Sequence, residues 1–76
     1  MDADFIRIEP ERNSFRFYRA AIWPDFFGRV SLIREWGRLG QPGTLRVDSY
    51  ASAEEARAAL DRLARSKRRR GYRQAA

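Results

Sequence analysis

The hydrophobic period of this sequence changes at Ser52, and that change limits the fold more than any other feature. Ser52 and Glu55 form a capping box, in which each side chain satisfies a free N–H group at the start of a helix. Gly71 is suited to the C-cap, and the residues after it are expected either to fray or to add an edge strand. Between the caps, one helical stripe is apolar: Ala56, Ala59, Leu60, Leu63 and Ala64.

Before Ser52 the pattern is that of short strands separated by turns. Pro10 ends one strand, "PDFFG" is a loop closed by Gly28, and "GRLGQPG" turns the chain with Gly37, Gly40 or Gly43 able to take a positive φ. The predicted strands are residues 4–10, 14–23, 29–36 and 44–50. The fold class is therefore predicted as α+β, an antiparallel sheet of about four strands with one C-terminal helix packed on it.

Alternation within the strands assigns side chains to faces. In the third strand, one face holds Val30, Leu32, Arg34 and Trp36. In the fourth strand, Leu45 and Val47 point one way, and Arg46 and Asp48 point the other.

Composition excludes several kinds of chemistry. The 76 residues suffice for a single domain, residues 1–76, whose core is marginal in size. The sequence contains no cysteine and no histidine. Disulfides, histidine-based triads and the usual zinc sites are therefore excluded. No paired carboxylate or glycine-rich phosphate loop stands out, so we expect no enzyme, no cofactor and no metal. The start resembles no signal peptide and no apolar run could span a membrane, so a cytoplasmic location is expected. The richness in arginine and the lone domain suggest a bacterium with GC-rich DNA, where the protein could be associated with the nucleoid.

The positive charge is concentrated at the C-terminal end. Residues 62–76 carry seven basic side chains and no acid, whereas residues 1–61 carry nine basic and ten acidic side chains. A localised basic segment suits an anionic partner, with nucleic acid first and an acidic protein or lipid surface next. Tyr72 adds a ring that could stack on a base or sugar. The alternative is a solvated helix end favoured by the helix dipole. The densest run is Lys67, Arg68, Arg69 and Arg70.

The tripeptide Trp36–Gly37–Arg38 allows two interpretations. The parity of Trp36 places it with core residues, but its position at a strand end also suits an exposed stacking platform. Gly37 would let another backbone come close. Arg38 is expected in a solvent-facing loop, directed more towards a partner than towards the fold.

Together these residues strongly resemble the WGR domain, which is named for the same tripeptide. The resemblance covers about residues 5–73 and is carried by the Trp-Gly-Arg residues and by Phe17, Tyr18, Gly28, Gly40, Gly43, Ala56 and the run from Lys67 to Tyr72. It implies one curved antiparallel sheet with a single helix. WGR domains of poly(ADP-ribose) polymerases bind DNA breaks and relay that binding to a catalytic domain. Others occur in bacteria, alone or in MolR-like proteins.

The resemblance also implies roles for particular residues. The family tryptophan lies against a DNA end, which corresponds to Trp36, and the family arginine contacts neighbouring domains, which corresponds to Arg38. Basic residues near the helix end, here 67–70, approach the DNA backbone.

We therefore expect a non-enzymatic nucleic-acid-binding module that binds DNA, in preference to RNA, at ends or nicks. The predicted site is Trp36, Gly37, Arg38, Lys67, Arg68, Arg69, Arg70 and Tyr72. The alternative hypothesis is a protein–protein adaptor that docks through the Trp-Gly-Arg loop.

Overall fold

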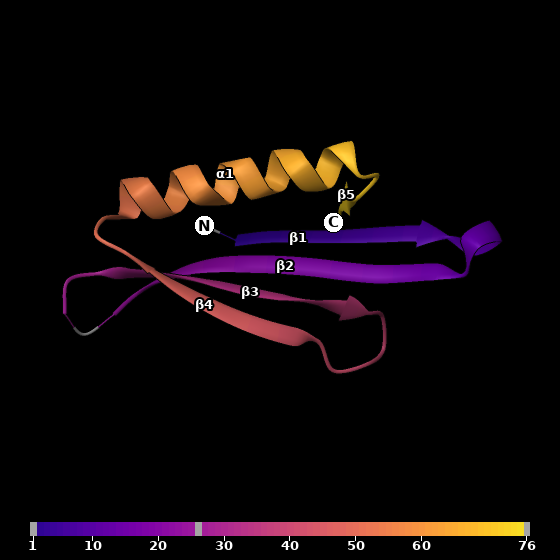
Figure 1. Cartoon of the computed structure of the whole chain (residues 1–76), viewed down its shortest axis with the longest axis horizontal. Coiled ribbons are helices and arrows are strands. Elements are labelled where there is room, and N and C mark those ends of the chain that lie inside the picture. Colours follow the sequence, from indigo (N-terminus) through magenta and orange to yellow (C-terminus); the bar gives the residue numbers. More distant parts are fainter. Residues whose placement is uncertain (1, 26, 76) are drawn as a thin grey trace.

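The computed structural model describes residues 2–25 and 27–75, which form one five-stranded antiparallel sheet, one α-helix and a short 3-10 helix (Figure 1). The strand order is β4-β3-β2-β1-β5. The elements are β1 (Asp2–Glu9), the 3-10 helix η1 (Pro10–Arg12), β2 (Ser14–Pro24), β3 (Val30–Arg38), β4 (Thr44–Tyr50), α1 (Ala53–Arg69) and β5 (Arg73–Gln74). The α+β prediction is confirmed, with five strands in place of about four.

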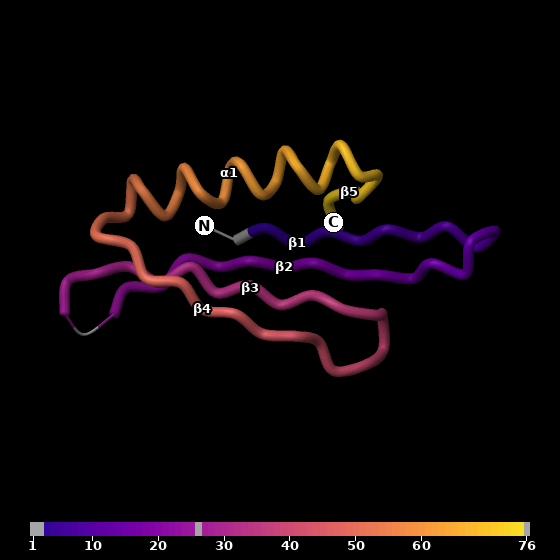
Figure 2. Tube along the Cα trace, in the orientation of Figure 1, coloured from indigo at the N-terminus to yellow at the C-terminus, as the bar shows by residue number. Residues whose placement is uncertain are grey.

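The fifth strand depends on how α1 ends. Gly71 adopts a left-handed φ of 90°, which reverses the chain after the helix. The Gly71 N–H donates to the Arg68 carbonyl at 3.1 Å and the Tyr72 N–H to the Lys67 carbonyl at 3.0 Å, so both of these carbonyls in the last turn are satisfied. The chain then returns beside β1, and β5 pairs with Phe5 and Ile6. Of the two predicted outcomes for this segment, the edge strand is the one found (Figure 2).

Three strands are longer than the sequence pattern predicts. β1 begins at Asp2, two residues before the predicted start, although it ends at Glu9, one residue before Pro10. β2 continues to Pro24, which the sequence pattern assigns to the following loop, because Pro24 still pairs with Val30. β3 continues through Gly37 and Arg38. The tripeptide is therefore part of the sheet rather than of a turn, since Gly37 and Arg38 lie opposite β2 residues. Of the three glycines proposed for positive φ in this region, only Gly40 has one, at 81°.

The core lies between α1 and one face of the sheet, which we call the helix face. The N-cap is as predicted: the Glu55 N–H donates to Ser52 Oγ at 3.2 Å. Glu55 in turn accepts from the N–H of Ala51, one residue before the N-cap, at 3.2 Å. The small side chains of the helical stripe allow α1 to lie close to the sheet. The buried cluster is Phe5, Tyr18, Ala20, Leu32, Ala59, Leu60 and Ala64.

Candidate nucleic-acid interface

Trp36 lies on the helix face, where the strand register places it directly opposite Tyr18. The two rings are stacked, with centroids 6.0 Å apart and planes inclined by 22°. Tyr18 is buried, whereas Trp36 is partly buried and packs against the edge of the core. The core interpretation of Trp36 therefore holds in part, because a portion of the indole packs against the core. The remainder is open to solvent, and its use as a stacking platform stays a prediction.

Lys67 lies between the ring of Tyr18, which belongs to this pair, and the ring of Tyr72. Its Nζ atom is 4.3 Å from the centroid of Tyr18 and 5.3 Å from that of Tyr72, distances at which a cation is attracted to a ring. Arg7 lies beyond, with Cζ 5.6 Å from the Tyr72 centroid. These side chains follow one another in space, and we call them the aromatic–lysine row: Trp36, Tyr18, Lys67 and Tyr72.

The pKa of Lys67 is lowered from its ordinary value, chiefly because burial removes the ammonium from water. The positive charges of Arg70, Arg34 and Arg7 lower it further. Lys67 therefore lies in a region of positive potential that would favour an anion.

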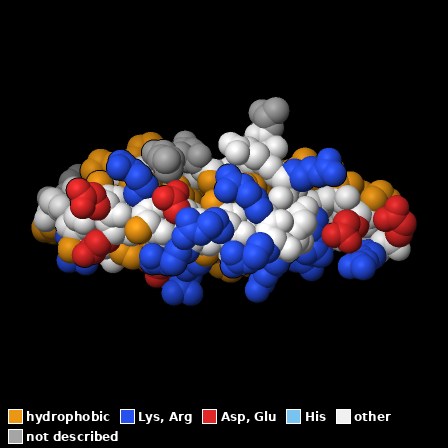
Figure 3. All heavy atoms as spheres, turned by 90° about the horizontal axis from the view of Figure 1, so that it is seen from above, with side chains coloured by type: hydrophobic (Ala, Val, Ile, Leu, Met, Phe, Trp, Pro, Cys, Tyr) orange, Lys and Arg blue, Asp and Glu red, His pale blue; other side chains and the backbone are white. Residues whose placement is uncertain are grey.

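The remaining basic residues of the predicted run do not point the same way. Successive residues of a helix are rotated by about 100°. Arg68 is directed towards β1, with Cζ 5.7 Å from the Phe5 centroid. Arg69 is exposed. Arg70 forms the C-cap, and its carbonyl accepts from Arg7 Nη1 at 3.1 Å. Figure 3 looks down on the α1 side and shows Lys and Arg side chains gathered along the middle of this face, with acidic side chains towards its two ends.

Gly37 and Arg38 make contacts within the chain. A Cβ atom on Gly37 would lie 3.1 Å from the Cα of Gly43 and 3.5 Å from the Phe17 ring. The backbone that approaches Gly37 is thus the chain's own turn. Arg38 is exposed, but its guanidinium donates to the carbonyl and side-chain oxygens of Asn13, both at 3.3 Å. The expectation that Arg38 points mainly towards a partner is therefore untested, whereas its link to the β1–β2 connection is present.

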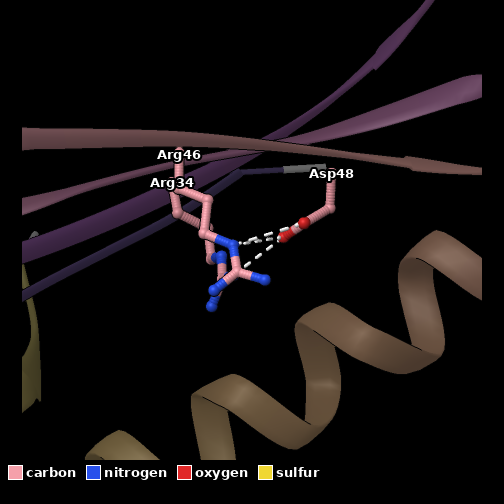
Figure 4. A network of polar contacts seen from close by, with 3 residues as sticks. All are labelled: Arg34, Arg46 and Asp48. Atoms are coloured by element: carbon pink, nitrogen blue, oxygen red, sulfur yellow. Dashed lines mark hydrogen bonds and ion pairs between the residues drawn. The ribbon is translucent and has the colours of Figure 1, made fainter.

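Three further charged residues border the same face and were not predicted as site residues. Asp48 accepts from Arg34 Nη2 at 2.7 Å, and Arg46 Nε lies 3.2 Å from the same carboxylate (Figure 4). These residues line an open polar pocket of about 300 Å³ between β3, β4 and α1, together with Arg62. The alternation of side chains along the third strand could have identified Arg34, because it places Arg34 on the same face as Trp36. The strand pairing was needed to bring Arg46 and Asp48 beside it.

The charges and hydrogen bonds of this network shift the pKa values of Arg34 and Asp48. Burial lowers the pKa of Arg34, but the Tyr18 hydroxyl and the Asp48 carboxylate more than offset this, so the pKa is raised. Burial raises the pKa of Asp48, but hydrogen bonds from Arg34 and Arg46 outweigh it, so that pKa is lowered. Arg34 and Asp48 therefore stay charged at neutral pH.

Within residues 2–25 and 27–75, no group of three or more acidic side chains is arranged to hold a metal ion. No helix among these residues is long and apolar enough to cross a membrane.

The chain is similar to the uncharacterized protein y4dW of Sinorhizobium fredii, with 46% identity over 68 residues, which is 88% of this chain. The match spans only 33% of that relative's length. The comparison with solved structures found no match. A family model of the WGR domain matches residues 1–76, the whole length of the sequence, and the strand-borne tripeptide and the capped helix lie where the resemblance implied, so this chain belongs to the WGR domain family.

Proposed function

We propose that this chain binds DNA through the aromatic–lysine row and the basic end of α1, with a preference for ends or nicks. WGR domains are in general nucleic-acid-binding modules and form a non-catalytic family. The observation that carries the proposal is the position of Lys67 between the Tyr18 and Tyr72 rings, with the partly open indole of Trp36 stacked on Tyr18.

The row provides the two contacts that a nucleic acid needs. The open part of Trp36 offers a flat surface for a terminal base or sugar, and such stacking contributes about 1–3 kcal/mol per base. Lys67 and the exposed arginines of α1 provide phosphate contacts. Neutralising about four to six phosphates would give a slope of about −4 to −5 for log K against log salt.

Ends and nicks are favoured for a steric reason. The indole of Trp36 already stacks on Tyr18, so one surface of the ring is occupied and the ring cannot insert between two stacked base pairs. An exposed terminal base pair, by contrast, can be covered from one side. The relative from Sinorhizobium supports a bacterial setting, and we place the protein in the cytoplasm with access to the nucleoid.

The adaptor hypothesis remains the alternative, with the turn after Arg38 as the docking element. The internal contacts support it less: Arg38 is bonded to Asn13, and Gly37 is in contact with Gly43. A partner would therefore have to replace existing bonds.

The test is a fluorescence-anisotropy titration at several salt concentrations. The labelled ligands are a nicked duplex with a 5′-phosphate, the same duplex intact with hairpin-closed ends, and a single strand. We expect tighter binding to the nicked duplex. Equal affinity for all three ligands, lost together as salt rises, would contradict the end-binding proposal and leave generic charge attraction. Absence of binding to any of them would favour the adaptor.

A matched pair of variants tests the platform. The chain has two tryptophans, and Trp23 lies on the opposite sheet face with 59% of its surface exposed. Trp36→Ala should weaken binding to the nicked duplex by about 5- to 150-fold, which corresponds to a loss of about 1–3 kcal/mol. Trp23→Ala should leave the affinity unchanged. Circular dichroism of each variant separates loss of the platform from loss of the fold, and equal effects of the two substitutions would contradict the role of Trp36.

A further inference from the structure

The outer edge of β4 is a long strand edge that pairs with no other strand of the described chain. β4 is the last strand in the order β4-β3-β2-β1-β5, and only its inner side pairs, with β3 (Figures 1 and 2). At the other end of the sheet, β5 is only two residues long. A free edge presents unpaired N–H and C=O groups that can accept another strand. β4 also carries exposed apolar side chains, with Leu45 63% and Val47 55% exposed.

The sequence of this edge is complementary to itself. Two copies of one strand pair antiparallel about a two-fold axis perpendicular to the sheet. The axis then lies midway between the two copies of one residue, and the same face of each sheet points to the same side of the dimer. β4 runs from Thr44 to Tyr50, and its middle residue is Val47. Pairing about Val47 uses all seven residues of the strand. It places Arg46 of each copy opposite Asp48 of the other.

Other registers lack this match. Pairing about Arg46 would oppose two arginines, and pairing about Asp48 would oppose two aspartates; like charges placed directly opposite are destabilising. Pairing about Leu45 or Ser49 shortens the overlap and separates Arg46 from Asp48. Arg46 is available for the new contact because 61% of its side chain is exposed. Asp48 would then lie between Arg34 and the arginines of both copies.

We propose that this chain forms a symmetric homodimer through antiparallel pairing of two β4 edges about Val47. The two five-stranded sheets become one continuous sheet, and both α1 helices lie on the same face of it. On the opposite face, Val47 contacts its own equivalent, and Leu45 lies opposite Ser49. The two aromatic–lysine rows then share one side of the dimer. This proposal does not depend on the ligand that the row binds.

The position of Val47 on the axis allows a direct test by analytical ultracentrifugation over a range of concentrations. Val47→Glu and Val47→Lys each place two like charges opposite one another, so each variant alone should be monomeric while the wild type forms a dimer. An equimolar mixture of the two variants should form a heterodimer, since glutamate then faces lysine. The matched control is Ile8→Glu, because Ile8 is also apolar, 51% exposed and on the same sheet face but in β1. It should dimerise like the wild type.

A wild type that stays monomeric at every concentration would overturn the proposal. So would single variants that dimerise as well as the wild type, or a mixture that does not recover the dimer.

A second measurement does not depend on charge. The chain has no cysteine, so Val47→Cys introduces a single thiol. Opposed residues of an antiparallel pair have Cα atoms about 4.5–5.5 Å apart, which suits a disulfide. Mild oxidation should link Val47→Cys into a dimer much faster than Ile8→Cys. Equal rates of linkage for the two variants would contradict the pairing about Val47.

Discussion

Substitution of Gly43 by alanine tests whether the tripeptide is held in place by close backbone contact. A Cβ atom at position 43 would lie 2.7 Å from Phe17 Cζ and 2.7 Å from the carbonyl oxygen of Trp36. Carbon atoms do not approach this closely without movement of one partner. Phe17 is buried and the carbonyl belongs to a paired strand, so neither can move freely. We expect Gly43→Ala to displace the turn after β3 and to strain the end of that strand.

The size of the effect follows from two opposing contributions. Overpacking a well-filled site costs about 1–3 kcal/mol. Replacing glycine by alanine also reduces the entropy of the unfolded chain, which returns about 0.4–1 kcal/mol. The net loss is roughly 1–2 kcal/mol. For a domain of this size, that loss lowers Tm by about 5–15 °C.

The assay is thermal unfolding followed by circular dichroism, with urea unfolding as a second measure of the free energy. Gly37→Ala should cost less than Gly43→Ala, because its Cβ would approach only to 3.1 Å from the Gly43 Cα. Gln41→Ala is the control, since Gln41 lies exposed in the same turn. A Tm for Gly43→Ala equal to that of the wild type would refute the reasoning, as would a greater loss in Gly37→Ala than in Gly43→Ala.

Three further predictions test other parts of the structure. Asp48→Asn should be less stable than the wild type at neutral pH. Because the folded pKa of Asp48 is lowered below 3.8, its contribution is present above 3.8 and is lost as the pH falls through the folded pKa, so urea unfolding at decreasing pH should show the two stabilities converging. Lys67→Met keeps the aliphatic stem but removes the charge between Tyr18 and Tyr72, so it should reduce the salt slope of DNA binding by about 1, whereas Lys67→Arg should leave the slope unchanged. Ser52→Ala removes the acceptor for the Glu55 N–H and should cost about 1 kcal/mol in urea unfolding.

The local features of the fold could be predicted from the sequence because they depend on neighbouring residues. The helix start at Ser52 and the reversal at Gly71 are set by residues within one turn of each cap. Alternation correctly grouped Leu32, Arg34 and Trp36 on one face. These signals are short in range, and each has one dominant physical cause.

The arrangement of the candidate site depends on strand register, which the sequence pattern left open. Tyr18 lies opposite Trp36 only because β2 and β3 pair in one register. Alternation separated Leu45 and Val47 from Arg46 and Asp48, but it did not say which pair faces the helix. The structure turns the charged pair towards α1 and leaves the apolar pair exposed, because Arg34 on β3 provides a partner for Asp48.

Two residues of the WGR tripeptide, Trp36 and Gly37, thus make their contacts on opposite faces of β3. Trp36 points to the helix face, where it meets Tyr18, and Gly37 points to the other, where it meets Gly43 and Phe17. Phe17 and Tyr18 are neighbours in β2, so the two contacts are made to adjacent residues of one strand. A displacement of the turn at Gly43 would therefore be transmitted through Gly37 to the indole of Trp36. For this reason we expect Gly43→Ala to weaken DNA binding even at temperatures where the domain remains folded, although Gly43 itself offers no side chain to a ligand.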